Sequence, residues 1–398
     1  MMITFNNAAE IVLSNSLKSE GEFIPLSEAL GRVLAQPVYA DRDMPPFDKS
    51  AVDGYACKAA DIVGELKLLE NIAAGFKPGK TVTAGCCSKI MTGAMLPEGA
   101  DTIIMVEECE DSGTSVRFNG KSLKSNICYK GEDIREGDKV LETGTFIKPE
   151  QIAILASFGV TNVFVAKLKK IGILSTGDEI VEPDAIPTLV QIRNSNGWQL
   201  RAQALRAGAI VNYYGIASDS ESSLREKLGK ALNDNDIVIL SGGVSMGDFD
   251  FVPAVLDEFG LKTLFNKVAV QPGKPSTFAV KYSQDGSAKK VVFALPGNPV
   301  SCFVQFELLI KPFLFKSMGG VAPGLKADLP FKSDYSRKHT ERLALIPVKI
   351  DSDGSFSPVK YNGSAHITAL NGANGIAEIP LGAGNFAAGE KVKVYILP

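Results

Sequence analysis

The stretch ILSGGVSMGDFD at residues 239–250 decides the fold, because an apolar run ends there in a glycine-rich turn. ILSTGDE at 173–179 and FALPGNPVS at 293–301 repeat this layout of a strand, a polar glycine turn and a helix. In a parallel sheet such turns lie at the carboxyl edge, where open α/β sheets bind ligands. Glycines let backbone N–H groups approach a phosphate closely, and helix N-termini favour the anion.

Around these turns the patterns of strand and helix alternate from Lys169 onwards, which predicts a mostly parallel sheet with right-handed crossovers. The expected strands are 171–175, 210–215, 236–240, 277–282 and 291–295, and the expected helices are 197–207, 221–232, 252–259 and 301–315. RNSNG at 193–197 should open a helix at the same edge, with Ser195 or Asn196 as its N-cap.

Outside this region the pattern changes. Residues 1–20 are typical of an amphipathic helix, and 26–35 indicate a short second helix that ends near Pro37. Short β runs separated by Gly and Pro turns fill 47–140 and recur from 322 to 398, which predicts a β domain in each. Another helix is expected at about 149–158.

Composition excludes several classes of protein. With 42 Lys+Arg against 45 Asp+Glu, the net charge of -3 gives no electrostatic footprint for nucleic acid. The six cysteines form no C-x-x-C pair, which favours free thiols in a reducing compartment. The two histidines, His339 and His366, disfavour a Ser-His-Asp hydrolase or a His-rich zinc site. No signal peptide and no apolar run of ~20 residues is found, so we expect a cytoplasmic protein without membrane contact.

The turns also carry carboxylates, which would repel a phosphate unless a cation intervenes. Mg²⁺ suits this role, because it binds one or two carboxylates together with phosphate oxygens. The alternative is that the acids are solvated surface groups. The carboxylates concerned are Asp178, Glu179, Asp219, Asp248 and Asp250.

At its motifs the sequence resembles the MoeA family, which includes the E domain of gephyrin. The segments that carry this resemblance are PPFDKSAVDGYA, MTGAMLPEGADTIIMVEE, GILSTGDEIV, IRNSNG, SGGVSMGDFDFV, QPGKPSTFA and LPGNPVSCFVQFELLIKP, in family order through 41–312. The match around Arg342 and NGSAH is weaker. The resemblance implies a multidomain α/β plus β protein whose α/β domain is like that of the MogA adenylyltransferases.

The implied domains are discontinuous. The MogA-like molybdopterin-binding α/β domain would comprise 1–24 and 168–321, and an elongated linker and dimerisation domain 25–46 and 141–167. A β-rich domain would comprise 47–140, and a C-terminal β-barrel 322–398. Family members are homodimers, with the active cleft formed between one subunit's α/β domain and parts of the other.

The activity implied is that of a molybdopterin molybdenumtransferase. Molybdenum from molybdate would enter adenylated molybdopterin with the assistance of Mg²⁺, and AMP would leave as the molybdenum cofactor forms. Contacts with a MogA-like adenylyltransferase and with molybdoenzyme apoproteins are also expected. Whether tungstate can replace molybdate is not readable from the sequence.

The site residues follow from these motifs and from charge. The expected catalytic residues are Asp53, Thr92, Asp133, Glu179, Lys267, Lys274, Arg342 and Ser364. The expected cofactor-binding residues are Thr176, Gly177, Asp178, Asn194, Ser195, Asn196, Ser241, Gly242, Gly243, Ser245, Gly247, Pro296, Gly297, Asn298 and Ser301. The expected metal ligands are Glu179, Asp219 and Asp250. Gln271 departs from the family pattern, in which a basic residue often precedes PGKP, so the anion site would lack one charge.

Two other functions compete. A MogA-like adenylyltransferase would share the α/β domain, but residues 25–167 resemble parts that belong to the MoeA family. A scaffold, as in gephyrin, would bind partners without turnover. Supplying ATP and molybdopterin discriminates the enzymes, since an adenylyltransferase makes the adenylate and an insertase consumes it.

Overall fold

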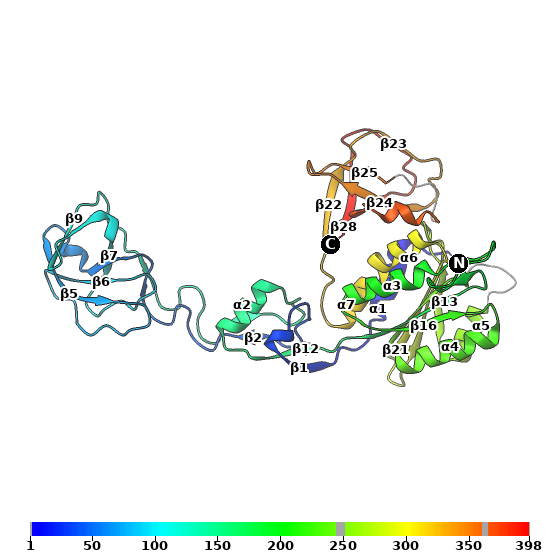
Figure 1. The fold of residues 1–398 in the computed structure, drawn as a ribbon, viewed down its shortest axis with the longest axis horizontal. Coiled ribbons are helices and arrows are strands. Elements are labelled where there is room, and N and C mark those ends of the chain that lie inside the picture. Colours follow the sequence, from blue (N-terminus) through cyan, green and yellow to red (C-terminus); the bar gives the residue numbers. More distant parts are fainter. Residues whose placement is uncertain (1, 244–250, 360–364, 398) are drawn as a thin grey trace. The chain divides into compact units, whose positions relative to one another are not determined.

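The computed structural model describes residues 2–243, 251–359 and 365–397, in two compact units (Figure 1). The large unit comprises 1–36, 143–148 and 162–398, and the small unit comprises 37–142 and 149–161. The segments expected to form a linker domain are divided between these units, and the division into four domains stays a prediction. Of the helices in the described residues, none has the length and apolarity of a bilayer-spanning segment.

The large unit is built on a six-stranded sheet of order β16-β13-β17-β21-β20-β18. The strands are β13 (Lys170–Thr176), β16 (Ile210–Ala217), β17 (Ile237–Ser241), β18 (Lys262–Lys267), β20 (Pro275–Tyr282) and β21 (Ala288–Leu295). The first four in the order run parallel, as predicted, whereas β20 is antiparallel to both of its neighbours. β17 is buried along its whole length, which explains its continuous apolar sequence. β18 was not predicted.

Helices cover both faces of this sheet (Figure 1). One face carries α1 (Phe5–Ser14), α3 (Ser195–Arg206), α6 (Pro299–Gln305) and α7 (Lys311–Ser317), and the other carries α4 (Glu221–Asp234) and α5 (Val252–Glu258). The helix expected at 301–315 is α6 and α7 joined by a π-helical turn, η4 (Phe306–Ile310). The other predicted helices of this region are confirmed.

The helix expected at 26–35 is wrong. The chain forms β1 (Gly21–Pro25), which pairs antiparallel with β12 (Asn162–Ala166), and then a single 3₁₀ turn, η1 (Leu26–Glu28). Beyond this turn the backbone N–H of Leu34 bonds to the carbonyl of Thr145, and that of Ala35 bonds to the carbonyl of Phe164. Pairing with distant backbone therefore replaces the local helical bonds.

A second sheet of the large unit has the order β19-β24-β26-β28-β22, with β25 beside β24. These strands are β19 (Val270–Gln271), β22 (Leu325–Pro330), β24 (Leu343–Ile350), β25 (Phe356–Pro358), β26 (Gly375–Ile379) and β28 (Lys391–Ile396). Phe331 and Phe356 fill its core. A β domain was predicted here, and the closed barrel stays a prediction. Smaller elements are β14 (Ile180–Val181), β15 (Ile192–Arg193), β23 (Tyr335–Ser336), β27 (Asn385–Phe386) and η5 (Ile367–Leu370).

The small unit contains the β-rich region and the helix α2 (Pro149–Ser157), both as predicted. Its sheet has the order β7-β4-β6-β5-β9-β8 around buried Tyr55, Leu66 and Ile104. The strands are β4 (Gly54–Cys57), β5 (Glu65–Ile72), β6 (Cys86–Ile90), β7 (Thr102–Met105), β8 (Cys109–Asp111) and β9 (Ser115–Phe118). Shorter elements are β2 (Val38–Tyr39), β3 (Lys49–Ser50), β10 (Ile127–Cys128), β11 (Lys139–Leu141), η2 (Ala59–Asp61) and η3 (Val106–Glu108). All six cysteines are free thiols.

Candidate functional site

The ends of four parallel strands bring the predicted glycine turns to one edge of the large unit's sheet. Gly177 follows β13, Gly242 follows β17, Gly297 follows β21, and Asp219 lies just beyond β16. Neighbouring strands are roughly 4.8 Å apart, so the four ends span roughly 14 Å. This edge also carries Thr176, Asp178, Glu179, Ser241, Gly243, Pro296, Asn298 and Ser301.

Two of these turns depend on glycine. Gly242 has a φ of 90°, and a Cβ added there would lie 2.5 Å from the carbonyl oxygen of Thr176. Its N–H bonds to the Leu295 carbonyl at 3.1 Å, so the turn is tied to the neighbouring strand. Gly177 has a φ of 138°, which is outside the range of most side-chain-bearing residues. Because glycine has no side chain, a ligand at this edge can approach the backbone of both turns closely.

Three buried oxygen atoms at this edge have no hydrogen-bond partner among the described residues. They are Thr176 Oγ1, Asn196 Oδ1 and Ser301 Oγ. Buried polar groups in folded proteins are nearly always bonded, so unpaired ones indicate a ligand or bound water. Asn196 is oriented by its amide nitrogen, which donates to the Gly297 carbonyl at 2.6 Å.

The N-cap of α3 is Asn194, and the prediction of Ser195 or Asn196 was wrong. Asn194 Oδ1 accepts from the N–H of Gly197 at 3.0 Å and from the hydroxyl of Ser175 at 3.1 Å. Ser175 is also bonded to Ser241 at 3.0 Å. Asn194 is only 2% exposed. Its bonds connect the end of β13 to the start of α3, whereas Ser195 and Asn196 lie in the first turn of the helix.

The predicted acids gather at the β16–β13 end of the edge. The N–H of Asp178 donates to Asp219 Oδ2 at 3.3 Å, and the N–H of Asp219 donates to Asp178 Oδ1 at 3.1 Å. Both residues and Glu179 are exposed. Within the residues that the structure describes, no three His, Cys, Asp or Glu side chains form a metal cage. Two carboxylates still fit Mg²⁺, because this ion usually takes its remaining ligands from phosphate and water.

Five predicted residues lie outside the described part of the chain. They are Ser245, Gly247, Asp248, Asp250 and Ser364.

A basic pocket of about 510 Å³ lies between the two sheets of the large unit. Lys274 and Arg342, both predicted, line it together with Gln271. No acidic side chain is among its lining residues in the described chain. Its remaining charged or polar lining residues include Asn298, Arg337, Lys338 and His339.

Arg337, which also lines this pocket, has incomplete hydrogen bonding in the described chain. Its Nη1 is buried with no partner in the described ranges, while Nε and Nη2 bond to the carbonyls of Ala383 and Pro380. Burial lowers the pKa of this guanidinium. Arg337 as a whole is half-buried, and a buried guanidinium nitrogen without a partner is costly unless an acceptor such as an oxyanion reaches it.

Lys267 does not line the basic pocket. It ends β18, opposite Pro275 at the start of β20, and is half-buried. Because β18 runs parallel to β21, Lys267 is at the same edge of the sheet as the glycine turns. Charge therefore changes along this edge, from acids at β16 and β13 to lysines at β20 and β18.

The other predicted catalytic residues belong to the small unit. Asp53 Oδ1 accepts from both the N–H and the hydroxyl of Thr92, each at 2.7 Å. These bonds, with the backbone bond the larger cause, lower the pKa of Asp53. Asp133 is an exposed loop residue whose N–H bonds to the Met44 carbonyl. The structure thus brings Asp53 and Thr92 together.

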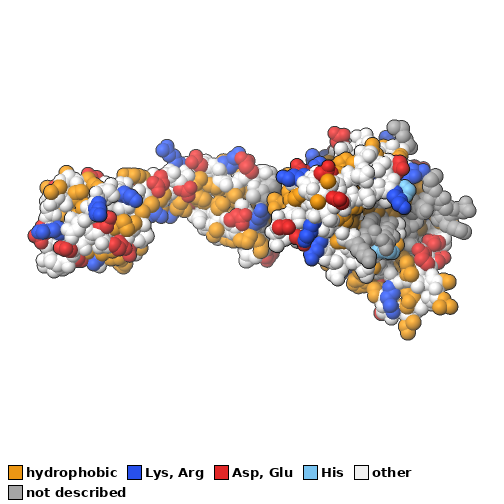
Figure 2. Space-filling view, turned by 90° about the horizontal axis from the view of Figure 1, so that it is seen from above, with side chains coloured by type: hydrophobic (Ala, Val, Ile, Leu, Met, Phe, Trp, Pro, Cys, Tyr) orange, Lys and Arg blue, Asp and Glu red, His pale blue; other side chains and the backbone are white. Residues whose placement is uncertain are grey.

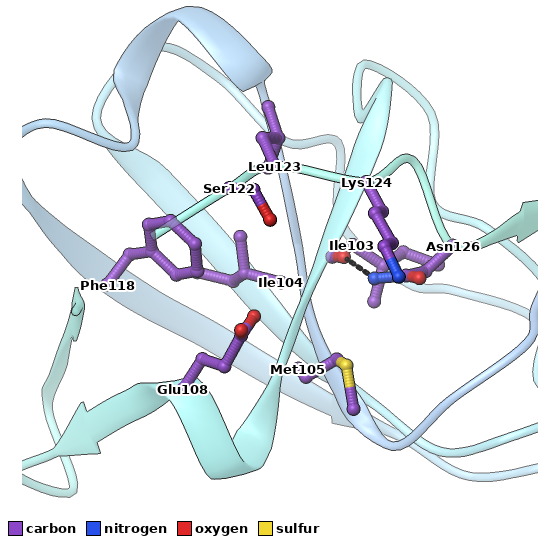
Figure 3. Close-up of a pocket in the computed structure, with 9 residues that line it drawn as sticks. All are labelled: Ile103, Ile104, Met105, Glu108, Phe118, Ser122, Leu123, Lys124 and Asn126. Atoms are coloured by element: carbon purple, nitrogen blue, oxygen red, sulfur yellow. Dashed lines mark hydrogen bonds between the residues drawn. The ribbon is translucent and has the colours of Figure 1, made fainter. Parts of the chain in front are cut away.

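A smaller pocket in the small unit holds none of the predicted residues (Figure 3). Ile104, Phe118 and the carboxylate of Glu108 face one another in it. Its volume is about 90 Å³, enough for roughly three waters. It is too small for a pterin or a nucleotide.

Sequence reasoning missed Arg337, Lys338 and His339. They form a basic run, and their charge pattern alone could have marked them as a candidate anion site. On the face shown in Figure 2, the described Lys and Arg side chains are interspersed with Asp and Glu, without a continuous basic band. The cationic character of the site is therefore local.

The fold and the site define an α/β protein with glycine turns at the carboxyl edge of a mostly parallel sheet and a basic pocket in the same unit. Family models match the chain as the MoeA N-terminal region (domain I and II) at 3–159, a probable molybdopterin binding domain at 172–316, and the MoeA C-terminal region (domain IV) at 325–397. The chain belongs to the MoeA family.

Relatives from several organisms agree. The chain is 34% identical over 406 residues to the molybdopterin molybdenumtransferase of Staphylococcus epidermidis, covering 99% of this chain and 95% of that one. It is 35% identical over 386 residues to that of Staphylococcus aureus, covering 94% and 90%. A molybdopterin biosynthesis MoeA protein of Pyrococcus horikoshii matches with a TM-score of 0.84 and 30% identity, covering 100% of both chains.

Proposed function

We propose that this protein is a molybdopterin molybdenumtransferase, which inserts molybdenum from molybdate into adenylated molybdopterin and releases AMP. The observation that carries the proposal is the sheet edge, where glycine turns and unpaired buried oxygens adjoin a cationic pocket. The names of the full-length relatives support the same activity. Such a site has one region suited to phosphates and another suited to a free oxyanion.

The phosphates of the adenylated substrate would lie against the glycine turns. The hydroxyls of Thr176 and Ser301 are unpaired and would supply donors there, and the glycines would let the phosphates approach the backbone closely. Asp178 and Asp219, with Glu179 beside them, would hold Mg²⁺. When bound, this ion would neutralise phosphate charge and polarise the anhydride for hydrolysis.

Molybdate would bind in the basic pocket. Arg342 presents a planar guanidinium that can hold two oxygens of an oxyanion, and Lys274 supplies a point charge. Asn298 lines the pocket and also precedes α6, so the pocket reaches the glycine turn after β21. Molybdate and the pterin substrate would thus meet near this residue.

Asp53 is better suited to orienting than to general base catalysis. Its lowered pKa keeps the carboxylate charged at neutral pH and makes it a weaker base. Thr92 holds it in one orientation. We propose that this pair orients a group of the substrate.

We further propose a cytoplasmic homodimer. Residues expected to form the linker provide short strand pairs, β1 with β12 and β2 with β11, and leave the apolar side chains of Phe23, Leu30 and Tyr39 exposed. Packing against a second copy would bury them. Light scattering that gives a stable monomer at micromolar concentration would refute this assembly.

The test of the activity is release of AMP from purified adenylated molybdopterin. Release should require molybdate and be stimulated by Mg²⁺. Formation of the adenylate from ATP and molybdopterin would instead indicate an adenylyltransferase. Binding of partner proteins without any AMP release would favour a scaffold.

A further inference from the structure

The side chain of Gln305, at the end of α6, is a buried amide that holds a distant loop. It is 1% exposed. Its Nε2 donates to the carbonyl of Gly273 at 2.9 Å and to the hydroxyl oxygen of Ser276 at 2.6 Å. Ser276, itself 2% exposed, also bonds to the Gly273 carbonyl at 2.7 Å. These three residues form a closed hydrogen-bonded set.

The loop is shaped around this amide. Gly273 has a φ of 105°, and a Cβ added there would lie 2.1 Å from Gln305 Nε2. Pro272 and Pro275 restrict the backbone on either side. The amide therefore fixes a short segment whose conformation only glycine can adopt.

The fixed segment carries Lys274, which follows Gly273 directly and lines the basic pocket with Arg342. Asn298, at the other end of α6, lines the same pocket. Helix α6 thus begins at Asn298 in the glycine turn after β21, and its last residue, Gln305, holds the loop that carries Lys274. This link keeps the glycine turn after β21 and the loop of Lys274 at a constant spacing.

We propose that Gln305 is a positioning residue that holds Lys274 in place for the oxyanion. The inference rests on the proposed function, because it takes the pocket to bind molybdate. Helix α6, which begins at the glycine turn after β21, would then also position Lys274. Nothing in the motif PGKP itself specifies this amide, since Gln305 lies 30 residues further along the chain.

The experiment compares the molybdate affinity of Gln305→Met with that of the unmodified protein by calorimetric titration with sodium molybdate. Methionine retains length and burial but removes both hydrogen bonds. Loss of a charge-assisted contact weakens affinity by about 10–150-fold, and a displaced lysine should give the lower end, about tenfold. If Gln305→Met does not fold, Ser276→Ala should show a smaller loss, about threefold.

Gln203→Met is the matched control. Gln203 is a buried amide of α3, 5% exposed, which donates to the Phe303 carbonyl on α6 at 3.3 Å and to Glu307 at 2.7 Å. It should destabilise the protein similarly without altering molybdate affinity. Equal weakening by both variants would mean that Gln305 acts only through general stability.

A double-mutant cycle with Lys274→Ala gives the decisive result. In the Lys274→Ala background, adding Gln305→Met should weaken binding no further, because the positioned group is already gone. An undiminished further tenfold loss would overturn the inference. Absence of oxyanion binding by the unmodified protein would instead overturn the proposed function on which it rests.

Discussion

Gln271→Lys should convert this protein into a tighter oxyanion binder. Gln271 is half-buried in the wall of the basic pocket that Lys274 and Arg342 also line, and its backbone pairs with Ala344 of β24. The side chain can therefore change while the strand pairing remains. The variant would introduce the basic residue that the resemblance led us to expect at this position.

The magnitude follows from Coulomb's law. Unit charges 4 Å apart interact by ~1 kcal/mol in water-like surroundings, so a doubly charged oxyanion gains ~2 kcal/mol from a new ammonium. This corresponds to about 30-fold in affinity. Repulsion between the new lysine and Lys274 or Arg342 should slightly destabilise the unliganded protein, and anion binding should reverse that loss.

The assay is calorimetric titration with molybdate at several salt concentrations, with Gln271→Met as the uncharged control. The gain of the lysine variant should be largest at low salt and should shrink towards 1 M, where the Debye length falls to about 3 Å. A lysine variant that binds no more tightly than the methionine variant would refute the reasoning. So would a gain that does not depend on salt.

Three further results are expected. Thr92→Val removes the side-chain donor to Asp53 and should raise its lowered pKa towards the ordinary aspartate value, as carboxyl NMR would show. A lowered folded-state pKa stabilises the protein above the unfolded value, and this stability is lost as pH falls through the folded pKa. The variant should therefore be less stable than the unmodified protein at neutral pH, with the difference disappearing in acid. Ser301→Ala removes an unpaired buried hydroxyl, so the unliganded protein should melt no earlier while substrate binding weakens, and an early melt would show that the hydroxyl has an internal partner. Asp219→Asn should raise the Mg²⁺ concentration needed for half-maximal AMP release with little change in thermal unfolding, because the side chain is exposed, and an unchanged Mg²⁺ response would exclude it as a ligand.

The sheet edge could be predicted because its signals are local. An apolar run such as 237–241 becomes a buried strand wherever helices cover both faces, and glycine follows because the turn requires a positive φ. Parallel strands then place the turns together without knowledge of their packing. The acids could be assigned to this edge for the same reason, whereas Lys274 lies there only because β20, which follows it, runs antiparallel to its neighbours.

Other features depend on packing between distant segments. Residues 26–35 have a helical pattern, yet Leu34 and Ala35 bond to backbone more than 100 residues away. Among the three polar residues at 194–196, Asn194 is the cap because Ser175 fixes its oxygen from the neighbouring strand. Local propensity is worth too little to resist such long-range pairing.

The sequence by itself determined the family, the parallel sheet and the turns at its carboxyl edge, because each depends on short segments whose conformation is set locally. Only the tertiary structure decided that Arg337 joins Lys274 and Arg342 around one pocket, and that Lys267 stays out of its wall. It also decided that Gln305 holds the lysine loop. Charge and hydrogen bonding act over a few ångströms in space, and distance along the chain does not reveal which groups come that close.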